Sequence, residues 1–313
     1  MSEGNQVSAS PRAGARRLTI AFAATAALIV AFLKPLYALV LYAAGSDVHS
    51  HILLVPIISA YLIYLLAGQL PRPGRPVVLG ALGCGLCALL AFACTMESLG
   101  IFSGLSLNDH LTFTTLSFVG SLAAMGFLVL GGKWMAAAAF PMSFLFFMVP
   151  LPDAVVTALE TASKYASAEA ASWFFDLAGV PYVRDSLLFG LPGITIEVAQ
   201  ECSGIRSSLV LIITSLLAAY LFLRSPWRRF LLVAFVIPLG VLRNGFRIAT
   251  IGWLCVHRGP HMIHSPIHKQ GGPIFFALSL IPLFLFLWWL RRNEQTRPRR
   301  AVAEISEPIS QQP

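Results

Sequence analysis

The stretch Ile194-Thr-Ile-Glu-Val-Ala-Gln-Glu-Cys-Ser-Gly-Ile-Arg-Ser-Ser208 joins two different kinds of local structure. Apolar and polar residues alternate from Ile194 to Val198, as in a half-buried strand, and a turn-forming run, Gly190 to Gly193, precedes them. An apolar run of membrane-spanning length follows, from Ile205 to Leu223. We therefore predict a small β-hairpin that leads into a transmembrane helix, with Cys202 at the junction.

Cys202 is a candidate nucleophile because its surroundings favour the thiolate. Ser203 and Gly204 suit a helix start, which would place the thiol at the positive end of the helix dipole. Arg206, four residues later, would lie one turn above Cys202 on the same helix face, and a nearby cation lowers the pKa of a thiol. Glu201 acts in the opposite direction. The alternative is that Cys202 is a small apolar residue packed within a helix.

The composition indicates a multi-pass membrane protein. The chain of 313 residues is 57% hydrophobic and 12% charged, with a mean hydropathy of +0.76, whereas soluble domains carry about 25% charged residues. The formal net charge of +8 comes from short basic clusters between apolar runs. We interpret this charge as membrane topology and not as nucleic-acid binding.

Apolar runs and basic clusters alternate along the whole chain, which predicts an all-α polytopic protein of about eight transmembrane helices. The predicted spans are 18–44, 52–67, 76–95, 111–131, 134–150, 205–223, 230–256 and 273–290. With both termini in the cytoplasm, 14 of the 22 Lys and Arg residues fall in cytoplasmic loops and tails, as the positive-inside rule requires.

Three parts are expected along the chain. Residues 1–17 are predicted to be a disordered cytoplasmic N-terminus, 18–290 a single integral-membrane domain, and 291–313 a basic cytoplasmic tail. Residues 154–178 have helical periodicity but scatter charges among Ala and Ser, so they predict an amphipathic helix on the membrane surface or inside the bundle. This helix and the hairpin would precede Cys202 on the extracytoplasmic side.

The remaining cysteines fit packing better than chemistry. Cys84, Cys87, Cys94 and Cys255 lie in or beside apolar runs, which gives no sign of a disulfide framework. The C-x-x-C formed by Cys84 and Cys87 has no second pair to complete a metal site.

Two arginines break the apolar pattern of the seventh predicted span. Arg243 and Arg247 share a helix face, with Asn244 between them. A charge inside a span costs about 2.5 to 3.5 kcal/mol on insertion scales, so such a residue is a candidate for function. Arg243 fits a structural or snorkelling role better than a catalytic one.

The outer loop that follows contains four histidines, which leave several functions open. They are His257, His261, His264 and His268. A cysteine, an arginine and a histidine together provide the nucleophile, the oxyanion stabiliser and the proton shuttle of acyl transfer. The alternatives are a metal-dependent intramembrane protease or metal transporter that uses these histidines, and a non-enzymatic transporter. Pro260 and Pro266 interrupt any helix that would align the histidines as ligands.

Several short motifs occur in a specific order on the predicted outer side. They are Ser50-His51, Phe140-Pro-Met-Ser-Phe144, Val149-Pro-Leu-Pro152, Cys202-Ser-Gly-Ile-Arg206, Asn244-Gly-Phe-Arg-Ile248 and His268-Lys-Gln-Gly271. Taken together, they resemble the exosortase/archaeosortase family of membrane-embedded cysteine transpeptidases. The resemblance covers most of the chain between residues 45 and 290, and the subfamily stays open.

The resemblance implies a function and a set of site residues. Cys202 would be the nucleophile, Arg247 the stabiliser of the thiolate or oxyanion, and His268 the general acid and base, with Arg206, Asn244 and Arg243 in support and no metal or cofactor. The substrates would be exported proteins with a C-terminal sorting signal, made of a short motif, a transmembrane helix and a basic tail. Cleavage would occur outside the cytoplasmic (inner) membrane of a bacterium, followed by transfer to a cell-surface acceptor linked to extracellular polysaccharide.

The topology can be tested with fused reporters. A reporter fused after Arg292 is expected to behave as cytoplasmic, and one inserted beside His261 as extracytoplasmic, because basic clusters are retained in the cytoplasm. Alkaline phosphatase activity and green fluorescence give opposite readouts for the two positions. The reverse pattern would place the proposed site in the wrong compartment.

Overall fold

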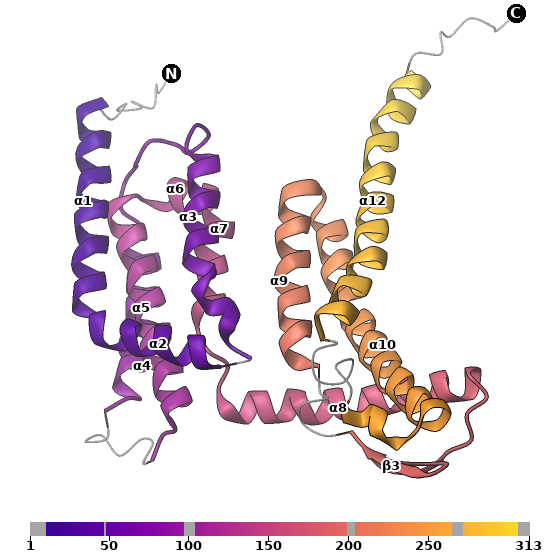
Figure 1. Cartoon of the computed structure of the whole chain (residues 1–313). Coiled ribbons are helices and arrows are strands. Elements are labelled where there is room, and N and C mark those ends of the chain that lie inside the picture. Colours follow the sequence, from indigo (N-terminus) through magenta and orange to yellow (C-terminus); the bar gives the residue numbers. More distant parts are fainter. Residues whose placement is uncertain (1–10, 47, 97–103, 199–203, 265–271, 306–313) are drawn as a thin grey trace, which may run out of the picture. The chain divides into compact units, whose positions relative to one another are not determined.

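The computed structural model describes residues 11–46, 48–96, 104–198, 204–264 and 272–305 (Figure 1). It divides into two compact units, residues 1–156 and 157–313. Each unit is built from helices, and the second also contains a small sheet.

The first unit begins with two helices, α1 (Pro11–Ala31) and α2 (Leu33–Gly45), where a single span was predicted. Pro35 explains the break, because its ring cannot donate a hydrogen bond and clashes with the carbonyl group four residues earlier. The predicted disorder of residues 1–17 is wrong for residues 11–17, which form the first turns of α1. A proline is well accommodated at the first turn of a helix.

The rest of the first unit is a set of short and long helices. They are η1 (Ser50–Leu53), α3 (Val55–Leu66), α4 (Val78–Ala93), α5 (Leu107–Val129), α6 (Gly132–Ala137), α7 (Ala139–Phe144) and η3 (Leu145–Met148). The chain that leaves η3 is held against the start of α5. Asn108 Nδ2 donates to the carbonyl oxygen of Leu151 and to Asp153 Oδ1, both at 2.7 Å. The Thr112 hydroxyl donates to the carbonyl oxygen of Pro150 at 3.0 Å.

The second unit contains the sheet and the longest helices. Its elements are most of α8 (Asp153–Leu177), the strands β1 (Val183–Asp185), β2 (Leu188–Leu191) and β3 (Ile194–Glu197), then α9 (Ile205–Phe222), α10 (Pro226–Arg258), η5 (Pro260–His264) and α12 (Gly272–Ile305). The predicted amphipathic helix 154–178 corresponds to α8. Helix α12 continues through much of the predicted tail, to Ile305.

The predicted hairpin is confirmed and gains a third strand. The strands are antiparallel in the order β1-β2-β3, with Phe189 of β2 opposite Ile196 of β3. Both of these side chains are buried, whereas their neighbour Thr195 is exposed, so the alternation of the sequence follows the two faces of the sheet. The buried face packs into a cluster with Phe175 of α8 and Ile248 of α10.

Helix α10 packs against both α8 and α9 in the second unit. A Cβ atom at Gly245 would lie 2.4 Å from Cβ of Ala170, so only glycine permits this approach to α8. Towards its start, α10 packs with α9 and α12 around Leu211, Leu232 and Leu283, which are all fully buried. The polar residues of α10 between these regions are therefore held on a rigid frame.

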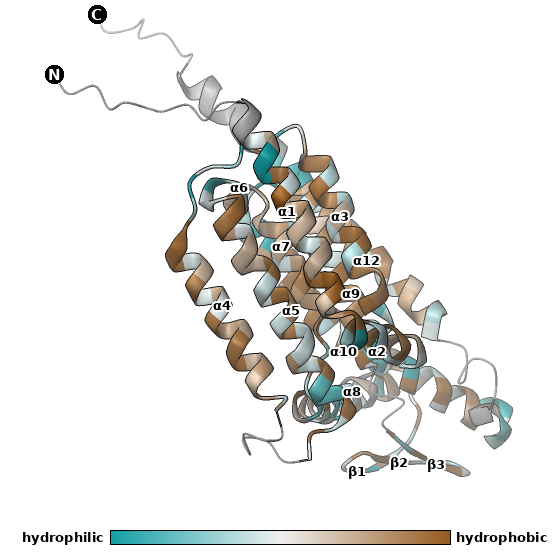
Figure 2. Ribbon diagram, turned by 90° about the vertical axis from the view of Figure 1, so that its left-hand side faces the viewer, coloured by the Kyte–Doolittle hydropathy of each residue, from teal (hydrophilic) through white to brown (hydrophobic). Residues whose placement is uncertain are grey.

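The all-α polytopic class is confirmed by the helices themselves. Among the described residues, five helices are long and apolar enough to cross a membrane, or six if Ala139–Met148 and Asp153–Leu177 form one bent span. Three further apolar helices have only 10–17 residues: Leu33–Gly45, Ser50–Leu66 and Val78–Ala93. Large apolar side chains cover the outside, such as Leu79 of α4, which is 83% exposed, and Figure 2 shows the hydrophobic colour along that helix. The chain is therefore a multi-pass membrane protein.

Candidate active site

Arg243 of α10 binds the segment that starts α9. Its Nη2 atom donates to the carbonyl oxygen of Gly204 at 3.2 Å and to the Ser208 hydroxyl at 3.3 Å. Arg243 is only 8% exposed, and its Nη1 atom has no hydrogen-bond partner within the described part of the chain. A buried cation is tolerated only where it is stabilised by such polar groups, so this contact fixes the start of α9 against α10.

Gly204 is the residue that ends the preceding segment and caps α9. Its φ of 68° lies in the left-handed region, and a Cβ atom there would lie 3.0 Å from the Asn244 side chain. Glycine is the residue that combines a positive φ with this close approach. The Ser207 hydroxyl also donates to the Gly204 carbonyl oxygen, at 3.0 Å.

Asn244 faces α8, one residue after Arg243. Its Nδ2 atom donates to the hydroxyl of Ser167 at 2.9 Å, and both residues are buried. A buried amide that loses its partner costs about 1 to 3 kcal/mol. This hydrogen bond therefore fixes the rotation of α10 relative to α8.

Phe246 joins α10 to the start of α12. Its ring lies edge-on to Phe275 with the ring centroids 6.0 Å apart, and edge-on to Phe174 of α8 at 5.4 Å. Phe275 lies in the first turn of α12, immediately after residues 265–271. The start of α12 is thus held beside the residue that precedes Arg247.

The sheet delivers the chain to the same part of α10. Val198, which follows β3, is 2% exposed, and its amide donates to the carbonyl oxygen of Leu187 at 3.0 Å. It belongs to the same buried cluster as Ile248 and Ala249 of α10. Val198 and Gly204, the residues on either side of the 199–203 segment, therefore both contact residues 243–249 of α10.

The predicted site arginines differ in how deeply they are buried. Arg247 is half-buried and lies one turn beyond Arg243 on the same side of α10, whereas Arg206 is exposed in the first turn of α9. Helical spacing does not extend across Gly204, because a left-handed residue interrupts the helix. Helix α9 therefore begins after Gly204, and the predicted position of Arg206 relative to Cys202 involves a residue outside the described part of the chain.

Two predicted catalytic residues, Cys202 and His268, lie outside the described residues, as do Glu201 and Ser203. Of the other cysteines, Cys255 is buried in α10, Cys87 is exposed on α4, and Cys84 and Cys94 are partly exposed.

His257 and His261, from the predicted outer loop, have separate surroundings. His257 stacks on Trp253, with the ring centroids 4.4 Å apart, and its Nδ1 atom lies 2.9 Å from the carbonyl oxygen of the same residue. His261 is exposed next to Gly259. Within the described residues, no group of three His, Cys, Asp or Glu side chains is arranged to hold a metal ion.

A second group of histidines lies in the first unit, in the turn before α3. His49 is 4% exposed and its ring packs at a tilt against that of Tyr42, while Nδ1 of His51 lies 3.1 Å from the carbonyl oxygen of Val48. Burial lowers the pKa of both imidazoles, so both are neutral at pH 7. Asp47, which the sequence places in the same turn, lies outside the described residues.

Sequence reasoning missed the residues that hold the site together. Ser167, Ser208 and Phe275 carry no chemical signal of their own, and each matters through one contact with α10. The signal that could have found Ser208 is its spacing from Gly204, which is one helical turn.

These features define a multi-pass helical membrane protein. In it, residues 243–249 of α10 contact Val198 and Gly204, the described residues that flank the predicted nucleophile. The family model of the transmembrane exosortases (Exosortase_EpsH) matches residues 42–285, more than half of the chain. The chain therefore belongs to the transmembrane exosortase family, which implies a cysteine transpeptidase that acts on C-terminal sorting signals. No curated protein and no solved structure matches it.

The contact between Arg243 and Gly204 can be tested by hydrogen exchange in detergent. Arg243→Gln is expected to lower the free energy of unfolding by about 1 to 3 kcal/mol, because a buried hydrogen bond to a carbonyl oxygen is lost. Exchange should become faster in the peptide that starts at Ile205 and remain unchanged in the C-terminal half of α12. Arg258→Gln, at an exposed position of the same helix, is the matched control. Equal exchange in the two variants would contradict the anchoring role.

Proposed function

We propose that this protein cleaves a C-terminal sorting signal by a cysteine mechanism, with Cys202 as nucleophile, Arg247 as oxyanion stabiliser and His268 as general acid and base. The observation that carries the proposal is the convergence on residues 243–249 of α10. Gly204 is bound by Arg243, Val198 packs in the cluster of Ile248, and Phe275 packs on Phe246.

Chain connectivity supports the pairing of Cys202 with Arg247. Cys202 is two residues from Gly204, so their Cα atoms are at most about 7 Å apart. Arg247 lies four residues beyond Arg243, about 6 Å along the helix axis, towards the end of α10 from which the sheet approaches (Figure 1). The arginine side chain is long enough for the Arg247 guanidinium to span a separation of this size.

Chain connectivity also limits where His268 can lie. It precedes Gly272, the first residue of α12, by four residues, which limits the separation of their Cα atoms to about 14 Å. Phe275, one turn into α12, is held by Phe246, the neighbour of Arg247. These limits allow an imidazole at position 268 to reach the 243–249 segment of α10.

The proposed chemistry proceeds in two balanced steps. The Cys202 thiolate attacks the scissile carbonyl carbon, the negative charge moves to the carbonyl oxygen beside Arg247, and the C–N bond breaks as His268 gives its proton to the leaving amine. The resulting thioester is then attacked by the acceptor. His268 takes the proton of that nucleophile, and the thiolate leaves.

The position of Arg247 along α10 fits a substrate that is cut at the membrane surface. Arg247 lies 18 residues after Arg229, about 27 Å along the helix, and the apolar core of a bilayer is about 30 Å thick. With the Arg229 end at the cytoplasmic boundary, Arg247 lies close to the outer one. A sorting signal whose transmembrane helix spans the same bilayer would present its preceding motif at this level, and an acceptor linked to extracellular polysaccharide would approach from outside the bacterial inner membrane.

The role of Cys202 can be tested against the other four cysteines. A variant with Cys84, Cys87, Cys94 and Cys255 all changed to Ala is expected to process a tagged substrate as well as the unaltered protein does. Cys202→Ala should abolish processing, because no other thiol replaces the nucleophile. Loss of activity in the four-cysteine variant, with the protein still present in the membrane, would point to a different thiol.

The division of roles between Arg247 and His268 predicts a second pattern. Arg247→Lys keeps the charge but loses the planar pair of N–H groups, so we expect a fall in processing of about 10²-fold or more. His268→Ala should also stop turnover, whereas the single changes His257→Ala, His261→Ala and His264→Ala should be tolerated. Cleavage of a tagged substrate is the measurement. Equal dependence on all four histidines, with activity that follows added Zn²⁺, would favour the metal alternative.

A further inference from the structure

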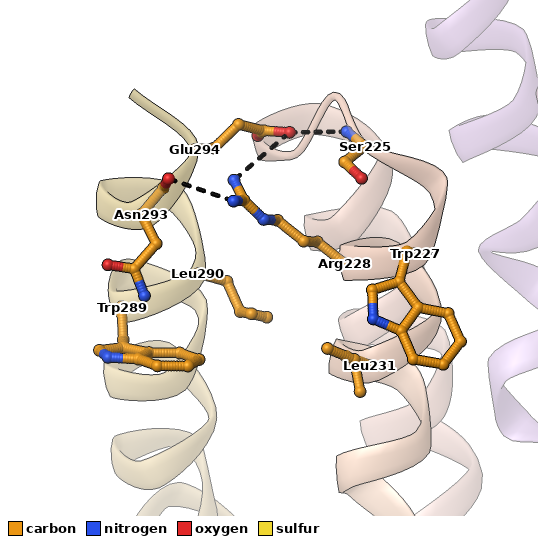
Figure 3. Close-up of a pocket in the computed structure, with 8 residues that line it drawn as sticks. All are labelled: Ser225, Trp227, Arg228, Leu231, Trp289, Leu290, Asn293 and Glu294. Carbon is orange, nitrogen blue, oxygen red and sulfur yellow. Dashed lines mark hydrogen bonds and ion pairs between the residues drawn. The ribbon is translucent and has the colours of Figure 1, made fainter. Parts of the chain in front are cut away.

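At the opposite end of the second unit, two adjoining cavities lie between the turn that joins α9 to α10 and the middle part of α12, residues 289–294. One, of about 700 Å³, is drawn in Figure 3 and lies between Trp227, Arg228 and Leu231 of α10 and Trp289 and Glu294 of α12. The other has a volume of about 460 Å³ and lies on the α9 side of Glu294. Glu294 lines both cavities and forms the wall that they share.

The carboxylate of Glu294 is directed towards the turn between α9 and α10. It accepts hydrogen bonds from the backbone amides of Arg224 at 3.0 Å and Ser225 at 2.7 Å. Nη1 of Arg228 lies 3.8 Å from Oε1, the oxygen that also accepts from Ser225, and Nη2 of Arg228 donates to the carbonyl oxygen of Asn293 (Figure 3). The negative charge of Glu294 is thus balanced by Arg228 and the start of α10.

The smaller cavity has an excess of positive charge. Arg224, Arg229 and Arg291 line it, against the single carboxylate of Glu294. The Arg229 guanidinium lies over the ring of Tyr220, 5.4 Å from its centroid, and that of Arg291 lies over Phe222 at 5.8 Å. Each aromatic ring contacts the flat face of a guanidinium group, so the N–H groups at the edge of the guanidinium stay available. Guanidinium N–H groups at such an edge can bind a phosphate group in a bidentate manner.

The cavity is also amphipathic and lies where the candidate membrane spans of α9 and α12 end, at Phe222 and Glu294. Leu221 and Phe222 line it and are both nearly half exposed. Trp227 and Trp289, also exposed, lie at the same end of the helices, as tryptophans do where a protein meets the headgroup region. A soluble anion would use the arginines only, whereas a phospholipid would use both the arginines and the apolar wall.

We propose that this cavity is a binding site for the headgroup of an anionic phospholipid. The phosphate group lies between Arg224, Arg229 and Arg291, and the start of the acyl chains lies against Leu221 and Phe222. Basic pockets between transmembrane helices bind lipid headgroups in this way. The bound lipid links the turn between α9 and α10 to the middle part of α12.

Native mass spectrometry of the full chain in detergent tests the site, with phosphatidylglycerol, phosphatidylcholine and inorganic phosphate titrated separately. The test variant is Arg224→Gln/Arg291→Gln, since both side chains are exposed and the hydrogen bonds to Glu294 come from the backbone. The matched control is Arg72→Gln/Arg75→Gln, which removes two exposed arginines from the first unit.

The unaltered protein should bind phosphatidylglycerol more tightly than phosphatidylcholine. Each arginine near an anionic lipid contributes about a fivefold gain in affinity, so the test variant should lose about 25-fold and the control should lose little. Equal affinity for the two lipids, or equal losses in the two variants, would overturn the proposal. Inorganic phosphate that binds as tightly as phosphatidylglycerol and displaces it would show that the site takes a soluble anion, and the lipid assignment would be wrong.

Discussion

The hydrogen bond from the buried Arg243 guanidinium to the Gly204 carbonyl oxygen is the contact on which the proposed site depends. A guanidinium group inside a helix bundle is costly unless polar groups surround it, and Gly204 and Ser208 supply them. In return, Arg243 fixes the place at which the chain turns from the sheet into α9. Gly204, two residues after Cys202, is thus held in place by α10.

The periodicity of α10 explains how one short stretch can serve so many partners. Successive residues are rotated by about 100° around a helix, so Arg243 reaches α9, Asn244 reaches α8, and Phe246 reaches both α8 and α12. Gly245 allows the close approach to α8 that this arrangement needs. Arg247 lies on the Arg243 side of the helix, one turn nearer to the end where the sheet packs. Val198, the last described residue before Cys202, packs with Ile248 and Ala249 in this part of α10.

The sequence predicted the class of fold and the order of its elements well. Hydropathy alone locates α5, α9, α10 and α12, and alternation locates the sheet, because both signals depend on burial over many residues. The break between α1 and α2 and the helical start at Pro11 were missed, since each depends on local backbone geometry near a proline. The left-handed conformation of Gly204 is another local backbone feature that neither signal reports. Contacts such as that of Asn244 with Ser167 join residues 77 positions apart, and no local pattern reports them.

The central claim is that α10 places Arg247 beside the Cys202 thiol, and the reactivity of that thiol tests it most directly. In a protein in which Cys202 is the only cysteine, the rate of alkylation can be followed as a function of pH with Arg247 present and with Arg247→Gln. The account predicts that the midpoint lies below that of an unperturbed thiol, about pH 8.5, and rises when the guanidinium is removed. A midpoint that is unchanged by Arg247→Gln would contradict the account.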